Sequence, residues 1–116
     1  MTVGNTMRIT MNDLEYDLDQ RVRHQGTLYS GTACEFYADG TVMTEQTFEQ
    51  GIPHGISRAF YPDGSIESEW RLDHGRRHGS HLRWHQNGQL AEDQNYDHGK
   101  LISSQAWHPD GTPDTL

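Results

Sequence analysis

Histidine has the most capacity for chemistry in this chain, with eight copies among 116 residues. Imidazole nitrogens bind zinc and exchange protons near neutral pH. His78, His81 and His85 gather around Trp84, with His74 just before them. On a regular strand His78 and His81 would point to opposite faces, while His81 and His85 would lie about 13 Å apart. This spacing does not favour chelation within one strand, so we expect no metal ion and no cofactor.

Carboxylates and cysteine are the other reactive groups. Glu45, Glu69 and Asp93 are spaced 24 residues apart. Carboxylate pairs can act as general acid and base, but a repeated row facing arginines is the simpler interpretation. Cys34 has no histidine beside it in its own unit, which leaves a Cys–His nucleophile unsupported. The glycines are not spaced as a phosphate-binding loop. We therefore expect a protein that is not an enzyme.

Most of these residues belong to one repeated unit. Three glycine registers share a 24-residue period: Gly31/Gly55/Gly79, Gly40/Gly64/Gly88 and Gly51/Gly75/Gly99. A fixed period in this range indicates a repeat architecture. The units are residues 31–54, 55–78 and 79–102, with a partial unit at 103–116. His54 shares a slot with His78, and His74 shares one with His98, so duplication accounts for much of the histidine content.

Each unit carries two turn signals. The first is Asp-Gly or Asn-Gly, and the second is a Gln-Gly or His-Gly pair such as Gln50-Gly51 or His74-Gly75. Both types tolerate the positive φ angles of tight hairpins. Residues between the turns alternate in polarity, as in strands with one packed face. We predict an all-β fold of repeated 24-residue β-hairpins in an elongated antiparallel meander, with residues 1–30 supplying capping strands.

Two neighbouring rows of residues have different expected roles. The first row, Phe36, Phe60, Trp84 and Trp107, should pack between units as core. The second row, Tyr37, Tyr61, His85 and His108, should lie on the opposite face of the sheet, beside the acids, because successive residues of a strand point to opposite faces. Tyrosine offers a large rigid surface with a polar end for a partner. The candidate partner-binding residues are therefore Tyr37, Tyr61, His85, His108, Glu45, Glu69 and Asp93.

The N-terminal stretch has a strand-like acidic pattern. Leu14, Tyr16 and Leu18 alternate with Asp13, Glu15, Asp17 and Asp19. We expect one extended edge carrying these four carboxylates. Such an edge either blocks unwanted strand pairing or docks a basic partner. At the other end, Pro109 and Pro113 should stop further pairing.

The combination of motifs resembles the MORN repeat (membrane occupation and recognition nexus). Residues 60–69 read FYPDGSIESE and are followed by His74-Gly75 and His78-Gly79, and residues 84–92 repeat them as WHQNGQLAE. The similarity is closest to the variant in bacterial antitoxin-like proteins of the YwqK type. It covers residues 26–111, with Ser103 standing where the repeat expects glycine. The resemblance implies an antitoxin or immunity protein that covers a protein toxin.

The net charge limits the classes of partner. A charge of −8 disfavours binding to nucleic acid and to anionic membranes and favours binding to a basic protein. The alternative is that the charge only keeps the chain soluble. Cys34 is the single cysteine and residues 1–11 contain no apolar signal segment, so we expect a cytoplasmic chain without a membrane span. The leading hypothesis is a protein-binding module. The alternatives are a small enzyme using His81, His85, Glu69 and Asp93, or a scaffold that self-assembles through its sheet edges, and the oligomeric state stays open.

Overall fold

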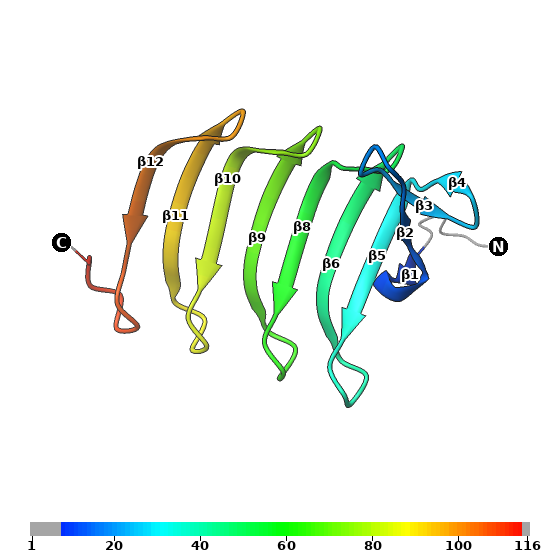
Figure 1. Cartoon of the computed structure of the whole chain (residues 1–116). Coiled ribbons are helices and arrows are strands. Elements are labelled where there is room, and N and C mark those ends of the chain that lie inside the picture. The colour runs from blue at the N-terminus through cyan, green and yellow to red at the C-terminus, as the bar shows by residue number, and fades with distance from the viewer. Residues whose placement is uncertain (1–7, 115–116) are drawn as a thin grey trace.

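The repeats form one long, twisted antiparallel sheet (Figure 1). The computed structural model describes residues 8–114. The strands of this sheet lie in the order β1-β5-β6-β8-β9-β10-β11-β12, and β7 also pairs with β6. The prediction of an all-β meander built from repeated hairpins is confirmed. The repeat strands are β5 (Gly31–Phe36), β6 (Val42–Glu49), β8 (Gly55–Phe60), β9 (Ile66–Asp73), β10 (Arg76–Trp84), β11 (Leu90–Asp97) and β12 (Lys100–Ala106), with the short β7 at Ile52–Pro53.

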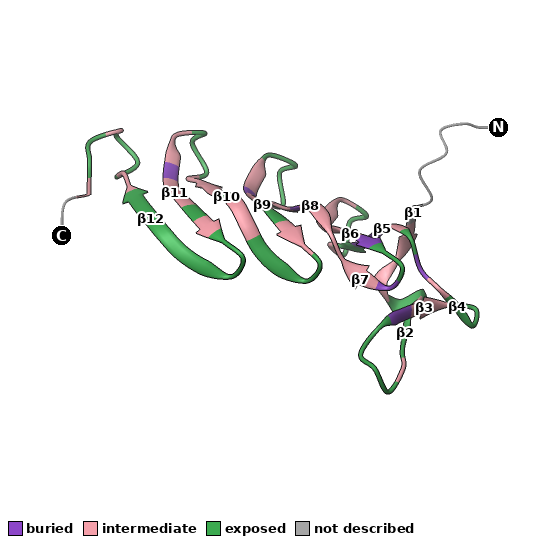
Figure 2. Ribbon diagram, turned by 90° about the horizontal axis from the view of Figure 1, so that it is seen from above, coloured by how far each residue is buried: buried purple, intermediate pink, exposed green. Residues whose placement is uncertain are grey.

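Residues 8–28 cap one end of this sheet, and residues 1–7 of the expected cap lie outside the described residues. Strand β1 (Arg8–Thr10) pairs in parallel with β5, and the 3-10 turn η1 (Met11–Asp13) follows it. Strands β2 (Glu15–Tyr16), β3 (Val22–His24) and β4 (Thr27–Leu28) make a separate small sheet beside the first repeat. Viewed from above, the repeats are a single curved layer and the cap lies at one end of it (Figure 2). Within residues 8–114 no helix is long and apolar enough to cross a membrane.

The Asp-Gly loops and the Asn87-Gly88 loop share one construction. In the first, the Tyr37 N–H donates to the carbonyl of Thr41 at 2.8 Å, and Gly40 has a φ of 93°. The Asp39 carboxylate also accepts the Thr41 N–H at 2.9 Å. This bond is the main reason why the pKa of Asp39 lies below its usual value. The loops at Gly64, Gly88 and Gly111 repeat the backbone bonds, so the sequence signal fixes one turn four times.

The second set of turns joins each unit to the one before it. His74 and Gly75 have φ angles of 50° and 86°, so both central residues are left-handed, as in a type I′ turn. The Gly75 N–H donates to the Pro53 carbonyl at 2.8 Å. One repeat earlier the same bond runs from Gly51 to Tyr29 at 2.8 Å, and one repeat later from Gly99 to Arg77 at 2.7 Å. Each turn is therefore tied to the preceding unit by its own backbone.

The buried core is concentrated under the cap. Val22, Tyr29, Ala33 and Phe48 form one cluster, with Ile9, Met11 and Leu14 packed against it. Along the repeats the buried positions are small: Cys34 is 0% exposed, and Ser57 and Ala91 are each 1% exposed. Large side chains cannot be buried where a single sheet has solvent on both sides, so burial increases towards the cap.

Two expectations about packing are wrong. The Phe36 row does not form a core, because Phe36 is 44% exposed and its other members are only half-buried. Each of its strand members lies beside a register shift at the end of a hairpin, where the described chain supplies no second layer. The acidic stretch is also not a continuous edge. It is broken into η1, β2 and a turn at residues 18–19, and its Asp17 carboxylate accepts a 2.8 Å bond from Arg23 Nε.

Alanine substitutions at two glycines should separate backbone strain from packing. Gly64 has a φ of 92° and open space where a Cβ would lie, so Gly64→Ala should cost about 1–2 kcal/mol for the left-handed backbone. At Gly51 a Cβ would lie 2.8 Å from the Val22 carbonyl oxygen and 2.9 Å from Leu28 Cδ2. Gly51→Ala should therefore cost about 2 kcal/mol more, from overpacking. Urea denaturation of both variants measures the difference, and equal losses would contradict the close approach of cap and turn.

Candidate binding surface

The tyrosines of the candidate row link neighbouring repeats. The Tyr37 hydroxyl donates to the Phe60 carbonyl at 2.6 Å, and the Tyr61 hydroxyl donates to the Trp84 carbonyl at 2.6 Å. His85 Nε2 lies 2.8 Å from the Trp107 carbonyl oxygen and takes the same position one repeat later. Each side chain thus reaches from one Asp-Gly loop to the next. The tyrosine hydroxyls that were expected to contact a partner are therefore hydrogen-bonded within the chain.

The fourth member of that row has more freedom. His108 is exposed, and its Nε2 lies 3.9 Å from Asp114 Oδ1. It belongs to the last loop, so no further repeat follows it within the described residues. Of the four residues, His108 therefore has its ring most open to another molecule.

The acid row lies in mid-strand and includes one cation, Arg58. Across the sheet, cross-strand pairing lines up Cys34, Glu45, Arg58, Glu69, Leu82, Asp93 and Gln105. Arg58 Nε donates to Glu69 Oε2 at 2.8 Å, and Arg58 Nη1 is 4.0 Å from Glu45 Oε1. The expectation that these acids face an arginine is correct for Arg58. The row is therefore a mixed line of charges rather than a purely acidic strip.

His81 lies on the other face of the sheet. It pairs across the strands with Trp70 and Gln94, and its ring centroid is 5.8 Å from that of Trp70 and 6.4 Å from that of Tyr96. Burial lowers the pKa of His81 because the charged imidazolium would lose hydration, and Arg77 and Arg83 add to the effect while Glu92 opposes it. Its Nδ1 has no hydrogen-bond partner within residues 8–114.

The residues of the enzymatic alternative are not assembled. His81 pairs with Trp70, whereas Glu69 and Asp93 both pair with Leu82, the next residue along. Successive strand residues point to opposite faces, so His81 is separated by the sheet from both acids. His85 is held at the loop by the Trp107 carbonyl. These four side chains do not converge on one cleft.

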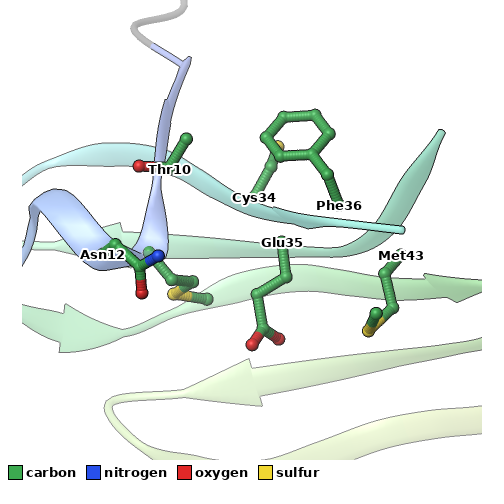
Figure 3. Close-up of a pocket in the computed structure, with 7 residues that line it drawn as sticks. Thr10, Asn12, Cys34, Glu35, Phe36 and Met43 are labelled. Carbon is green, nitrogen blue, oxygen red and sulfur yellow. The ribbon is translucent and has the colours of Figure 1, made fainter. Parts of the chain in front are cut away.

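One hollow lies where the cap meets the first hairpin. It has a volume of about 270 Å³ and is lined by Thr10, Met11, Asn12, Cys34, Glu35, Phe36 and Met43 (Figure 3). The Glu35 carboxylate accepts a 2.8 Å bond from the Thr44 hydroxyl. Cys34 is fully buried, so its thiol is not presented as an accessible nucleophile.

The last strand, β12, has an exposed apolar surface that was not among the residues expected to bind a partner. Every residue from Lys100 to Gln105 in β12 is exposed, and Leu101 and Ile102 remain 46% and 63% accessible. Strand β12 is the end of the sheet order, so its outer edge is open within the described chain. The available signal was the Leu101-Ile102 pair in an otherwise polar strand, next to the missing glycine at Ser103.

Taken together, the fold defines a single-layer β-hairpin repeat protein, whose units are joined by backbone and side-chain bonds of one recurring pattern. The family model described as the MORN repeat variant matches residues 29–50, 53–72 and 77–98, more than half of the chain. The chain therefore belongs to the MORN repeat variant family, whose repeats generally form binding modules. No curated protein and no solved structure matches the chain.

Removing one loop-to-loop bond should lower stability. Tyr61→Phe deletes the hydroxyl that donates to the Trp84 carbonyl while keeping the ring. We expect the free energy of unfolding to fall by about 1 kcal/mol. Tyr16→Phe is the matched control, because Tyr16 is 72% exposed on the cap. Equal stability of the two variants in urea denaturation would show that the loop bond contributes nothing.

The His81 environment predicts a low titration midpoint. In an NMR titration the imidazole signals of His81, assigned by their loss in His81→Gln, should have a midpoint below the ordinary value of 6.5. A lowered folded pKa means that the unfolded chain takes up this proton first as the pH falls. The contribution of His81 to stability is therefore present at neutral pH and declines below about pH 6.5. A midpoint at or above 6.5 would contradict the packing against Trp70 and Tyr96.

Proposed function

We propose that this chain is a non-enzymatic binding module that holds a basic protein partner at its C-terminal repeat. The observation that carries the proposal is the exposed edge of β12, from Lys100 to Gln105. An open strand edge presents unpaired backbone groups and can accept a further strand from a partner. Leu101 and Ile102 add apolar surface at the same place.

Charge supports the choice of partner. The chain carries a net charge of −8, so an approaching basic protein is attracted and like-charged proteins are repelled. Asp93 lies on β11, which adjoins β12, and His108, whose ring is exposed, lies in the loop that follows β12. In this proposal they extend the contact beyond the edge, while Tyr37, Tyr61 and His85 keep the repeats in register behind it.

The finer proposal is that the partner is a toxin and that this chain is its antitoxin or immunity protein. Its support is the resemblance of the repeats to YwqK-type antitoxin-like proteins. A protein that neutralises by covering needs an exposed surface and no chemistry of its own. The β12 edge supplies exposed surface, and the candidate enzymatic residues do not converge.

The test is direct binding to defined proteins. The purified products of adjacent genes should be presented to the chain in isothermal titration calorimetry, with stable complexes expected for a basic product. Relief of growth arrest on co-expression would support the antitoxin proposal for that product. Absence of binding by every adjacent product would contradict the proposed partnership.

A pair of lysine variants tests the location. Ile102→Lys places a cation on the β12 edge and should weaken binding to the basic partner at least tenfold. Leu18→Lys makes the same change at a side chain of the cap that is fully exposed, and should leave affinity unchanged. Equal melting temperatures of the two variants would show that both fold. Unchanged affinity of Ile102→Lys would exclude β12 as the contact.

A further inference from the structure

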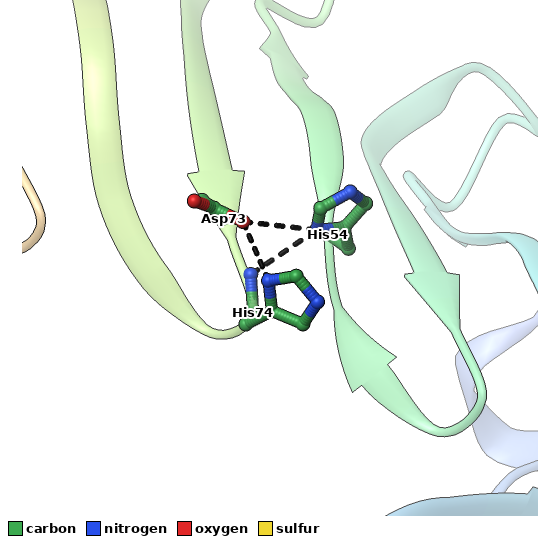
Figure 4. Close-up of side chains that lie close together, drawn as sticks. All are labelled: His54, Asp73 and His74. Atoms are coloured by element: carbon green, nitrogen blue, oxygen red, sulfur yellow. Dashed lines mark hydrogen bonds and ion pairs between the residues drawn. The ribbon is translucent and has the colours of Figure 1, made fainter.

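Three side chains with metal-binding atoms meet beside one type I′ turn (Figure 4). His54 precedes β8, Asp73 is the last residue of β9, and His74 begins the turn that follows. One ligand atom from each lies within 4.8 Å of the other two. His74 Nδ1 is 2.6 Å from Asp73 Oδ1, and His54 Nδ1 is 3.7 Å from the same oxygen.

The next repeat builds the same cluster again. His78, Asp97 and His98 stand 24 residues after the first three, and their ligand atoms also lie within 4.8 Å of one another. His98 Nδ1 is 2.7 Å from Asp97 Oδ1, and His78 Nδ1 is 3.8 Å from it. The two histidine rings of this cluster are 4.3 Å apart between centroids.

The backbone fixes both clusters. The His74 N–H donates to His54 Nδ1 at 3.1 Å, and the His98 N–H donates to His78 Nδ1 at 3.2 Å. His74 and His98 have φ angles of 50° and 46°. The turn thus holds one histidine in a left-handed conformation directly against the histidine of the preceding unit. This pairing joins residues 20 apart in neighbouring units, so spacing along a single strand does not predict it.

We propose that each cluster binds one divalent transition-metal ion of the Zn²⁺ type through two imidazoles and one carboxylate. Nitrogen and carboxylate donors suit Zn²⁺, at bond lengths of about 2.0–2.2 Å. Tetrahedral ligands at that distance are about 3.4 Å apart. To bind the ion, His54 Nδ1 and His78 Nδ1 would exchange the backbone hydrogen bond for the metal as the side chains rotate. Two histidines and a carboxylate leave a fourth position for water or for a group from another molecule.

The surroundings favour a cation. Asp73 serves the first cluster and is also 3.7 Å from His98 Nε2 through its other oxygen, so negative charge lies between the clusters. Glu49 Oε2 is 3.5 Å from His54 Nε2. The side chains of His74 and His98 are 77% and 59% exposed, which leaves a path for the ion. Ion binding at these clusters does not depend on the proposed protein partner.

Zinc titration of the full chain without a histidine tag tests the proposal. Isothermal titration calorimetry should give two Zn²⁺ ions per chain for the wild type and one for His74→Asn or His98→Asn. The double variant should bind neither ion. Asparagine adopts left-handed φ readily and keeps the backbone donor, so the turn is preserved. Changing a residue that only hydrogen-bonds to a metal ligand lowers metal affinity roughly 10–100-fold. Loss of a direct ligand should lower the affinity of its site at least as much.

Control and spectroscopy complete the test. His108→Asn removes an exposed histidine outside both clusters and should still bind two ions. Electron paramagnetic resonance of the Cu²⁺-loaded chain should show hyperfine coupling to two imidazole nitrogens per ion. Absence of Zn²⁺ binding to the wild type, or two ions retained by the double variant, would overturn the proposal. Binding of only one ion by the wild type, abolished by either single variant, would indicate one shared site in place of two and would also overturn the proposal.

Discussion

The hydrogen bond from each type I′ turn to the preceding unit is the constraint on which the rest of this structure depends. The N–H groups of Gly51, Gly75 and Gly99 donate to Tyr29, Pro53 and Arg77 at 2.7–2.8 Å. In each case the donor is available because two successive residues hold positive φ. The bond sets the position of a whole hairpin relative to the one before it. At the opposite end of the hairpins, Tyr37, Tyr61 and His85 repeat the linkage through side chains.

This arrangement explains how a chain with 32% hydrophobic residues can fold. Each unit needs to bury area only against its neighbours, as in other repeat proteins. Along the repeats the buried side chains are small, and the large ones gather beneath the N-terminal cap. Because so little of the sheet is covered, much of its surface and the β12 edge remain accessible. The open edge on which the proposed binding function rests is thus a consequence of how the array is stabilised.

The period and the turn signals were sufficient to predict the hairpin array. They specify local backbone geometry, which depends on residues close in sequence. The aromatic row around Phe36 was misplaced, because alternation assumes an uninterrupted strand and a register shift lies beside it. The contacts of Tyr61 and the pairing of His54 with His74 join residues about one repeat apart. They depend on how neighbouring units stack, which the repeat period alone does not specify. The broken acidic stretch failed for a related reason: Asp17 satisfies neighbouring donors instead of extending a strand.

Amide hydrogen exchange at the turn glycines is the most direct test of this account. Gly75 and Gly99 are exposed residues at the tips of hairpins, where amides of free loops exchange rapidly. If their N–H groups hold the units together, they should be as protected as amides in the middle of β9 and β10. Gly26 occupies the equivalent turn of the β3–β4 hairpin and supplies a comparison outside the repeats. Exchange of Gly75 and Gly99 at the rate of free loops would contradict the claim that the turns carry the stacking.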